Sequence, residues 1–167
     1  VTKKLKSYFI KKYFEPDIQI KLTNELLKFA NSSIDISDGL VDDLEKMINN
    51  QKLSYEIWQE KVPISKNLQS YLRKNNYKKS NFISNGDDYQ ILFTAGADKS
   101  RIIKETSKKL GVKISRIGKI RPNNQKSLFA TSMPPARILE STRSPGSVIW
   151  YLARSLYRPS RELTGMG

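Results

Sequence analysis

The sequence predicts an α/β or α+β sandwich in which helices cover one side of a sheet. Two observations point to this fold class. Residues 1–126 alternate between segments with helical spacing and short apolar segments typical of strands. The helical segments also place their apolar residues on one face, as helices packed on a sheet do. The chain of 167 residues is long enough to bury a sizeable core, and the absence of cysteine excludes disulfides.

The individual elements follow from apolar spacing, helix breakers and caps. Pro16 separates the first two helical segments, and Pro63 introduces a later helix. Gly111 ends the last helix, because glycine is the residue most suited to the position after a helix C-terminus. The expected helices are 4–13, 17–30, 40–48, 63–74 and 102–110; the expected strands are 33–37, 53–58, 89–94 and one or two short strands within 112–120.

Composition changes abruptly near residue 127. After Lys126 there is no lysine and no asparagine, arginine supplies all the positive charge, and four of the seven prolines occur. Prolines and serines at this density predict a poorly ordered tail. We therefore expect a domain at 1–126 and a compositionally distinct tail at 127–167 that is not part of it. Within the tail, residues 148–157 are apolar enough for one short helix.

Composition also restricts the chemistry. Without histidine or cysteine, a metal must be bound by oxygen, which favours magnesium, manganese or calcium. The formal net charge of +14 is compatible with a polyanionic partner such as RNA, or with lysines on solvated faces. No signal-peptide core is present, and no apolar run approaches the roughly 20 residues of a membrane span. A cytoplasmic protein without membrane contact is expected.

The run Ser-Ile-Asp-Ile-Ser-Asp-Gly-Leu at residues 33–40 is the first candidate site. In a strand, the isoleucines on either side of Asp35 would enter the core while Asp35 and Ser37 share the other face. Ser37 is placed to cap the following helix, with Asp38 in its first turn. Asp35 and Asp38 would converge at a strand-to-helix corner where a phosphate and its metal can bind. A plain N-cap is the alternative, although it leaves Asp35 without a role.

The run Ser-Asn-Gly-Asp-Asp-Tyr at residues 84–89 is the second candidate site. Asn-Gly is a hairpin-turn signal, and aspartates often follow turns, so an ordinary turn is one interpretation. The other interpretation is a ligand site. Two adjacent carboxylates and Tyr89, at the mouth of a buried strand, suit contacts with a cationic or hydroxyl-bearing ligand.

Together the two motifs resemble those of the thiamine-monophosphate kinase family. Residues 34–40, followed by Asp-Leu at 43–44, resemble the family motif Asp-Ile-Ser-Asp-Gly-Leu. Residues 85–94 resemble its Gly-Gly-Glu-Asp-Tyr-Glu-Leu-Leu-Phe-Thr. The Pro-Ile-Ser at 63–65 and the Ile-Gly-Lys-Ile at 117–120 match a proline-led segment and a late Ile-Gly-x-Ile of the family. All four elements occur in the family's order and spacing.

The resemblance covers roughly residues 8–126. It implies the C-terminal domain of a two-domain kinase in the aminoimidazole-ribonucleotide-synthetase-like superfamily, with an α+β fold and a mixed sheet covered on one side by helices. The implied reaction transfers the γ-phosphoryl group of ATP to thiamine monophosphate, which gives thiamine diphosphate. The resemblance also implies Mg²⁺ between carboxylates and phosphates, and a homodimer of the full-length protein.

Residue roles come from the resemblance, motif by motif. Asp35 and Asp38 correspond to magnesium ligands, and Ser37 corresponds to an ATP contact. Asp87, in place of the family's glutamate, and Tyr89 correspond to residues near the thiamine phosphate. Phosphoryl transfer depends mainly on positioning and charge neutralisation, so a site without histidine is chemically sufficient.

The sequence departs from the family pattern at both ends. The family's N-terminal domain, with its own aspartate-rich metal site, is absent, and the start of the C-terminal domain is shortened. An aromatic residue that helps to hold the substrate in the family has no match in the tail. We therefore expect a fragment that is inactive alone. A basic RNA-binding or polyanion-binding module without catalysis is the alternative, and a structural remnant without a ligand is a third interpretation.

Overall fold

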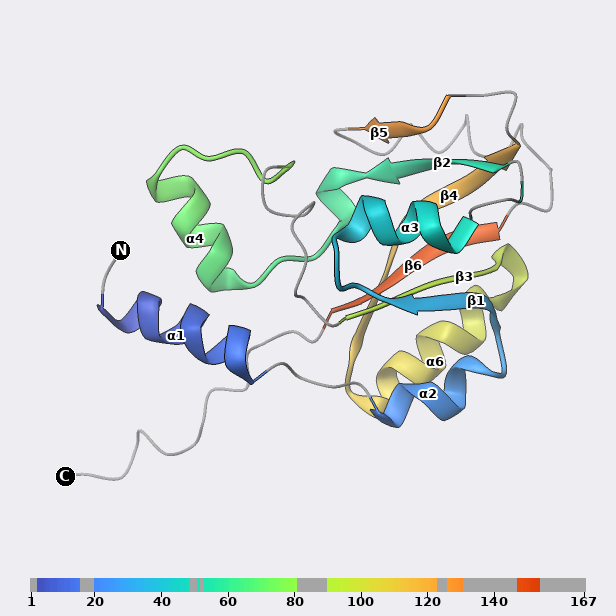
Figure 1. Cartoon of the computed structure of the whole chain (residues 1–167). Coiled ribbons are helices and arrows are strands. Elements are labelled where there is room, and N and C mark those ends of the chain that lie inside the picture. Colours follow the sequence, from blue (N-terminus) through green and yellow to red (C-terminus); the bar gives the residue numbers. More distant parts are fainter. Residues whose placement is uncertain are drawn as a thin grey trace.

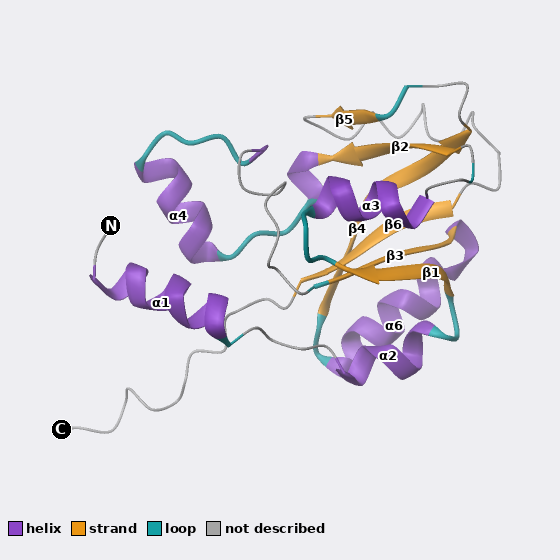
Figure 2. Cartoon of the chain, in the orientation of Figure 1, coloured by secondary structure: helices purple, strands orange, loops and turns teal. Residues whose placement is uncertain are grey.

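A computed structural model describes residues 3–15, 20–48, 51, 53–80, 90–122, 126–130 and 147–153. These residues form a six-stranded sheet with helices packed around it (Figures 1 and 2). The described elements are α1 Lys3–Phe14, α2 Ile20–Leu26, β1 Ala30–Asp35, α3 Leu40–Ile48, β2 Leu53–Trp58, the 3-10 helix η1 Gln59–Lys61, α4 Lys66–Lys74, β3 Ile91–Gly96, the 3-10 helix η2 Ala97–Lys99, α6 Ser100–Leu110, β4 Lys113–Pro122, β5 Leu128–Ala130 and β6 Ser147–Ala153.

The sheet has the strand order β1-β3-β6-β4-β2-β5. Neighbouring strands from β1 to β2 are antiparallel, whereas β5 runs parallel to β2 at one edge. The predicted α+β class with a mixed sheet is therefore confirmed. Residues 113–122 form one strand, β4, whose pairing with β6 shifts register between Arg116 and Gly118. The predicted helix end at Gly111 is also found, with a left-handed backbone at φ 64°.

Helices cover both faces of the sheet, whereas the sequence predicts cover on one side. Leu92 of β3 and Ile149 of β6 face a core that includes Leu44 of α3. The next residues along the same strands, Phe93 and Trp150, face a second core with side chains from α2 and α6. Each strand alternates its side chains between the two faces, so a single strand contributes to both cores. The site described below lies on the α3 side.

Residues beyond 126 join the domain, so the predicted boundary is wrong for 128–130 and 147–153. β6 lies between β3 and β4 and pairs antiparallel with both. Residues Val148 to Leu152 are each at most 5% exposed. A strand buried on both faces is a continuous apolar run, and periodicity alone does not distinguish it from a buried helix. This explains why a helix is predicted within 148–157. The rest of the predicted tail lies outside the described residues.

Two helices lie to one side of the sheet (Figure 1). The ring of Phe9 on α1 contacts that of Tyr71 on α4, with 6.0 Å between centroids. Ser65 caps α4, since its hydroxyl accepts a hydrogen bond from the Leu68 amide at 3.1 Å. Among the described residues, no helix is both long and apolar enough to cross a membrane.

A buried acid ties β2 to β4. Glu56 is 2% exposed, and its carboxylate contacts the Arg121 guanidinium. The Lys119 ammonium lies 3.6 Å from the same carboxylate. The Trp58 indole donates to Glu56 Oε1 at 2.7 Å. Burial opposes ionisation of Glu56, but the hydrogen bonds from Trp58 and Arg121 outweigh it and lower the pKa. Two positive side chains of β4 therefore meet at one carboxylate of β2.

Candidate functional site

The first motif meets Gln90 and Ile91, which follow the second motif in sequence, at one end of the β1–β3 pair. Asp35, the last residue of β1, pairs with Ile91 at the start of β3. The Ile36 amide then donates to the Gln90 carbonyl at 2.9 Å, which continues the pairing by one residue. Gln90 directly follows the second motif in sequence. Asp87 and Tyr89, the predicted substrate contacts, lie outside the described residues.

The corner between β1 and α3 is positioned by its apolar residues. Ile36 is 1% exposed and Leu40 is 2% exposed, and both belong to the core under α3. Between them the chain turns at Gly39, whose φ of 137° is a conformation that side-chain-bearing residues rarely adopt. The prediction that the isoleucines flanking Asp35 face inward is confirmed: Ile36 is in this core, and Ile34 packs against it. The polar residues of the motif are thereby held at the surface.

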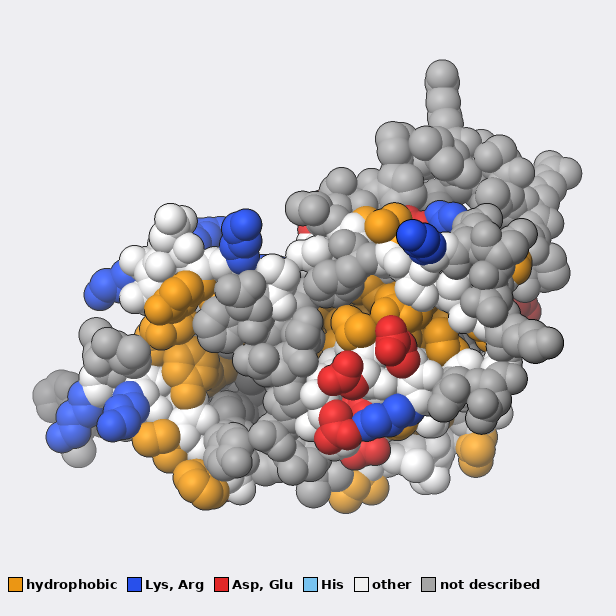
Figure 3. All heavy atoms as spheres, turned by 45° about the horizontal axis from the view of Figure 1, so that its top comes forward, with side chains coloured by type: hydrophobic (Ala, Val, Ile, Leu, Met, Phe, Trp, Pro, Cys, Tyr) orange, Lys and Arg blue, Asp and Glu red, His pale blue; other side chains and the backbone are white. Residues whose placement is uncertain are grey.

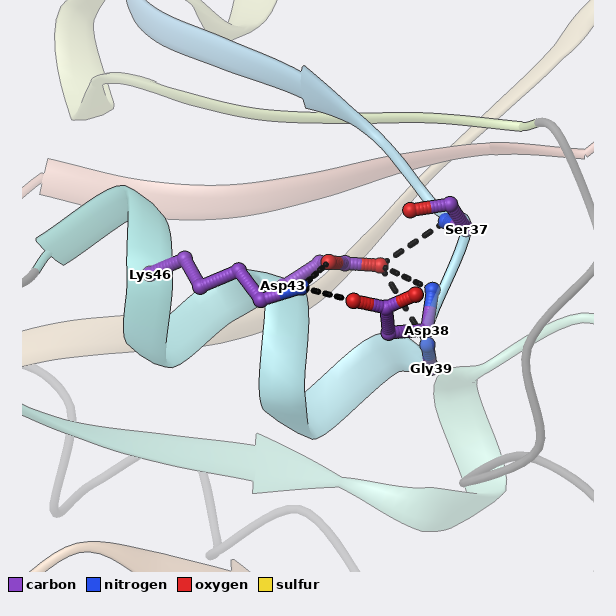
Figure 4. Close-up of polar contacts among 5 residues, drawn as sticks. All are labelled: Ser37, Asp38, Gly39, Asp43 and Lys46. Carbon is purple, nitrogen blue, oxygen red and sulfur yellow. Dashed lines mark hydrogen bonds and ion pairs between the residues drawn. The ribbon is translucent and has the colours of Figure 1, made fainter.

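One carboxylate organises the turn. Asp43 Oδ2 accepts hydrogen bonds from the amides of Ser37 at 2.8 Å, Asp38 at 3.0 Å and Gly39 at 3.2 Å (Figure 4). Asp43 is only 1% exposed. Amides ahead of a helix have no partner within the helix, and a negative charge at this end interacts favourably with the helix dipole. The aspartate therefore caps α3 from within the helix's own first turn.

This arrangement corrects two expectations. The sequence predicts that Ser37 caps the helix with Asp38 in its first turn, whereas α3 begins at Leu40 and Asp43 provides the cap. The sequence also predicts that backbone amides at the corner meet a phosphate. The three amides from Ser37 to Gly39 instead bind the protein's own carboxylate. These three amides are therefore not available to a phosphate.

Lys46, one turn further along α3, completes the corner. Its ammonium donates to Asp43 Oδ1 at 2.8 Å and also contacts Asp38 Oδ2 (Figure 4). Burial opposes ionisation of Asp43, but hydrogen bonds from Lys46 and from the three amides lower its pKa overall. The pKa of Lys46 is raised by its hydrogen bonds with Asp38 and Asp43. Lys46 therefore remains positively charged between the two carboxylates.

The solvent-facing side of the corner is acidic, although the chain as a whole is basic. Figure 3 shows acidic side chains gathered together on one face of the molecule, with a basic group among them. Glu45 is held by β2, since the Tyr55 hydroxyl donates to its carboxylate at 2.7 Å. The Tyr55 pKa is raised by burial and by this carboxylate. The exposed acids between residues 35 and 45 are Asp35 at the end of β1, Asp38 in the turn, and Asp42 and Glu45 on α3.

The donor set at the corner suits an open magnesium site. Within the described ranges, no group of three or more Asp, Glu, His or Cys side chains could hold a metal by itself. Mg²⁺ is commonly bound by one or two carboxylates, with water and substrate phosphates completing the octahedron. Asp35 and Asp38, both exposed and both oxygen donors, fit that pattern. Asp35 lies at the end of β1, while Asp38 is paired with Lys46 in the turn.

Two residues of the corner have no role in the sequence interpretation. Asp43 belongs to the Asp-Leu that follows the first motif, but the expectation assigns no contact to it. Its position was a detectable signal, because it is an acid three residues after Leu40 and next to Leu44, on the apolar side of an amphipathic helix. An acid there must find partners when buried. Lys46 carries no comparable signal, since a lysine in an exposed helical position is ordinary.

The fold and the corner together define a class of protein. It is an α+β domain with an open, acidic, oxygen-only corner suited to a divalent cation and its phosphate ligand. No protein-family model matches the chain. Curated relatives nevertheless confirm the resemblance inferred from the motifs: the chain is similar to part of thiamine-monophosphate kinases.

Two curated relatives illustrate this similarity. The thiamine-monophosphate kinase of Buchnera aphidicola subsp. Acyrthosiphon pisum is 38% identical over 125 residues, which are 72% of this chain and 37% of that protein. The enzyme of Aquifex aeolicus is 36% identical over 86 residues, which are 51% of this chain and 28% of that protein. The chain thus spans well under half of the length of these relatives.

Solved structures confirm the fold. The thiamine-monophosphate kinase of Stenotrophomonas maltophilia superimposes with a TM-score of 0.68 at 23% identity, covering 81% of this chain and 42% of that one. A structure of AaThiL complexed with AMPPCP and TMP gives a TM-score of 0.64 at 23% identity, covering 89% of this chain and 43% of that one. The fold therefore corresponds to less than half of these structures.

Proposed function

We propose that this chain is part of an ATP-dependent thiamine-monophosphate kinase and supplies one portion of its metal and nucleotide site. The whole reaction transfers the γ-phosphoryl group of ATP to thiamine monophosphate. The observation that carries the proposal is the corner itself. The Asp-Ile-Ser-Asp-Gly-Leu turn, held by Asp43, lies beside the start of β3, where the second motif ends. Relatives that share up to 38% identity are named as this kinase, and a structural neighbour is complexed with AMPPCP and TMP.

Each predicted residue has a role in this proposal. Asp35 and Asp38 would hold Mg²⁺, and the Ser37 hydroxyl would contact ATP. Asp87 and Tyr89 would lie near the thiamine phosphate. A bound magnesium ion supplies neutralisation of phosphate charge. The chain's own contribution is to fix the turn through Asp43, so that the backbone from which the Ser37 and Asp38 side chains project is held in a defined place.

The proposal includes three further expectations from the sequence. The chain is a fragment that does not turn over substrate alone, the full-length protein is a homodimer, and its location is cytoplasmic. The RNA-binding alternative rests on the net charge of +14. It is less favoured at this corner, because the four exposed acids there would repel a polyanion.

Calorimetric titration with Mg²⁺-ATP, with and without thiamine monophosphate, tests the proposal. We expect Asp35→Asn to weaken Mg²⁺-ATP binding by about tenfold, since it removes one of two carboxylates from the metal. Asp98→Asn is the matched control, because Asp98 is an exposed acid paired with Lys99 on η2. Binding that is equal in wild type and Asp35→Asn contradicts the proposed site. Release of ADP by the chain alone contradicts the expected inactivity.

A further inference from the structure

We propose that Lys46 is a tethered cation that competes with Mg²⁺ for the Asp38 carboxylate, so that the chain lowers its own metal affinity. This inference rests on the proposed function, since it concerns the same site. Lys46 contacts Asp38 Oδ2, the group that the proposal assigns to the metal. A carboxylate oxygen that accepts a hydrogen bond from an ammonium is a poorer donor to a second cation.

The two partners of Lys46 differ in how firmly they are held. Asp43 is 1% exposed in its side chain and is bound by three backbone amides, so it cannot move without disrupting the turn. The Asp38 side chain is 62% exposed and can turn toward a metal ion. Asp43 therefore holds the Lys46 ammonium in place, and the ammonium and a metal ion would both contact Asp38. When a metal takes Asp38, Lys46 remains at Asp43, 2.8 Å from its Oδ1.

The position of Lys46 thus opposes metal binding in two ways. The metal must first displace the ammonium from Asp38, and it must then bind close to a positive charge that stays in place. Both terms weaken binding, because like charges at short range repel even in a partly solvated site. Removing the Lys46 charge should remove both terms while Asp43 keeps its three amide bonds.

The experiment is a Mn²⁺ titration of the full chain at low salt, followed by electron paramagnetic resonance of free Mn²⁺. We expect Lys46→Met to tighten Mn²⁺ binding by about three- to tenfold, given the typical strength of partly exposed ion pairs. Lys46→Arg keeps the charge and should show no gain. Lys28→Met is the matched control, since Lys28 pairs with Glu25 at 2.6 Å on a different element. Circular-dichroism melting checks that each variant folds.

A double variant identifies the carboxylate through which Lys46 acts. In an Asp38→Asn background, Lys46→Met should give no gain, because the shared ligand is gone. A gain that persists there, or that Lys28→Met reproduces, shows a general charge effect and overturns the inference. If Asp38→Asn abolishes Mn²⁺ binding and Lys46→Met binds Mn²⁺ as wild type does, the inference fails and the proposed function stands. If Asp38→Asn binds as wild type does, or no variant binds Mn²⁺ saturably, the metal site fails and the inference fails with it.

Discussion

Asp43 and Glu56 are both buried acids whose pKa values are lowered, but they are held in different ways. The partners of Asp43 are Lys46 and the amides at residues 37–39, all within six positions along the chain. The partners of Glu56 are Trp58, two positions away, and Lys119 and Arg121 on β4, 63 and 65 positions away. Backbone and sequence-local groups therefore hold the first carboxylate, whereas the second also depends on two positive side chains that the sheet brings to it from β4. The difference separates a carboxylate that shapes a site from one that joins strands.

The strongest test of this comparison is Glu56→Ala. We expect the free energy of unfolding to fall by about 3 kcal/mol, because removing Glu56 leaves the partly buried charges of Lys119 and Arg121 without the carboxylate they share. Urea unfolding followed by fluorescence measures the change. Glu105→Ala is the control. Glu105 pairs with Arg101 on the surface of α6, where such pairs contribute about 0.5 kcal/mol. Equal losses in the two variants would show that the buried network is no stronger than a surface pair.

Asp43→Ala should lower stability less than Glu56→Ala does, but it should weaken Mg²⁺-ATP binding more. We expect a loss of about 2 kcal/mol, since the cap is removed and three amides lose their acceptor. Mg²⁺-ATP binding should also fall, because Ser37 and Asp38 lose their fixed positions. Asp43→Asn keeps an acceptor oxygen and should lie between wild type and Asp43→Ala. Calorimetry and urea unfolding on the same samples separate the two effects. A Glu56→Ala protein that loses nucleotide binding while still folded would contradict the division of roles.

Gly39 and Gly111 offer a matched pair of smaller changes. Both have positive φ, 137° and 64° respectively. Alanine at either position should cost about 1 kcal/mol from backbone strain. Only Gly39→Ala should weaken Mg²⁺-ATP binding, because Gly39 lies in the turn held by Asp43, whereas Gly111 ends α6. Binding affected equally by both substitutions would indicate a general loss of folding.

Acid should lower the free energy of unfolding by protonating Asp43 and Glu56. This is the smallest of the expected effects. The pKa of Asp43 is lowered by folding from 3.8, and that of Glu56 is lowered from 4.5. A lowered pKa stabilises the protein above the unfolded value, and this contribution is lost as pH falls through the folded value. Stability should therefore be level near neutrality and decline as pH falls below about 4.5. Glu56→Gln should flatten the upper part of the decline and Asp43→Asn the lower part, as measured by urea unfolding across pH.

The same contrast explains what could be predicted from sequence. Patterns read within a few residues succeed: the inward isoleucines around Asp35, the helix from Leu40 and the end of α6 at Gly111 are all found. The position of Asp43 on the apolar side of α3 is a signal of the same local kind. Its use as the cap, in place of Ser37, depends on the path of the turn, which composition does not specify.

Long-range pairings are not available from such patterns. Nothing near Glu56 indicates that Arg121 will neutralise it, because only the β2–β4 register brings them together. The same limit applies to β6, where an apolar run within an arginine- and proline-rich segment proves to be the central strand. The presence of helices on both faces is also a property of the assembled sheet, since the sequence of one strand shows only which side chains alternate between its two faces.

The place of β6 has a consequence for how the protein is made. A chain leaves the ribosome from its N-terminus at about 5–20 residues per second. β3 and β4 therefore emerge before the strand that lies between them, and the 24 residues between Pro122 and Ser147 take roughly 1–5 s to synthesise. During that interval both strands lack a partner on the side that β6 will fill, and open strand edges pair readily with other chains. Closure of this sheet thus waits until β6 has been synthesised, and until then β3 and β4 present open edges to other chains.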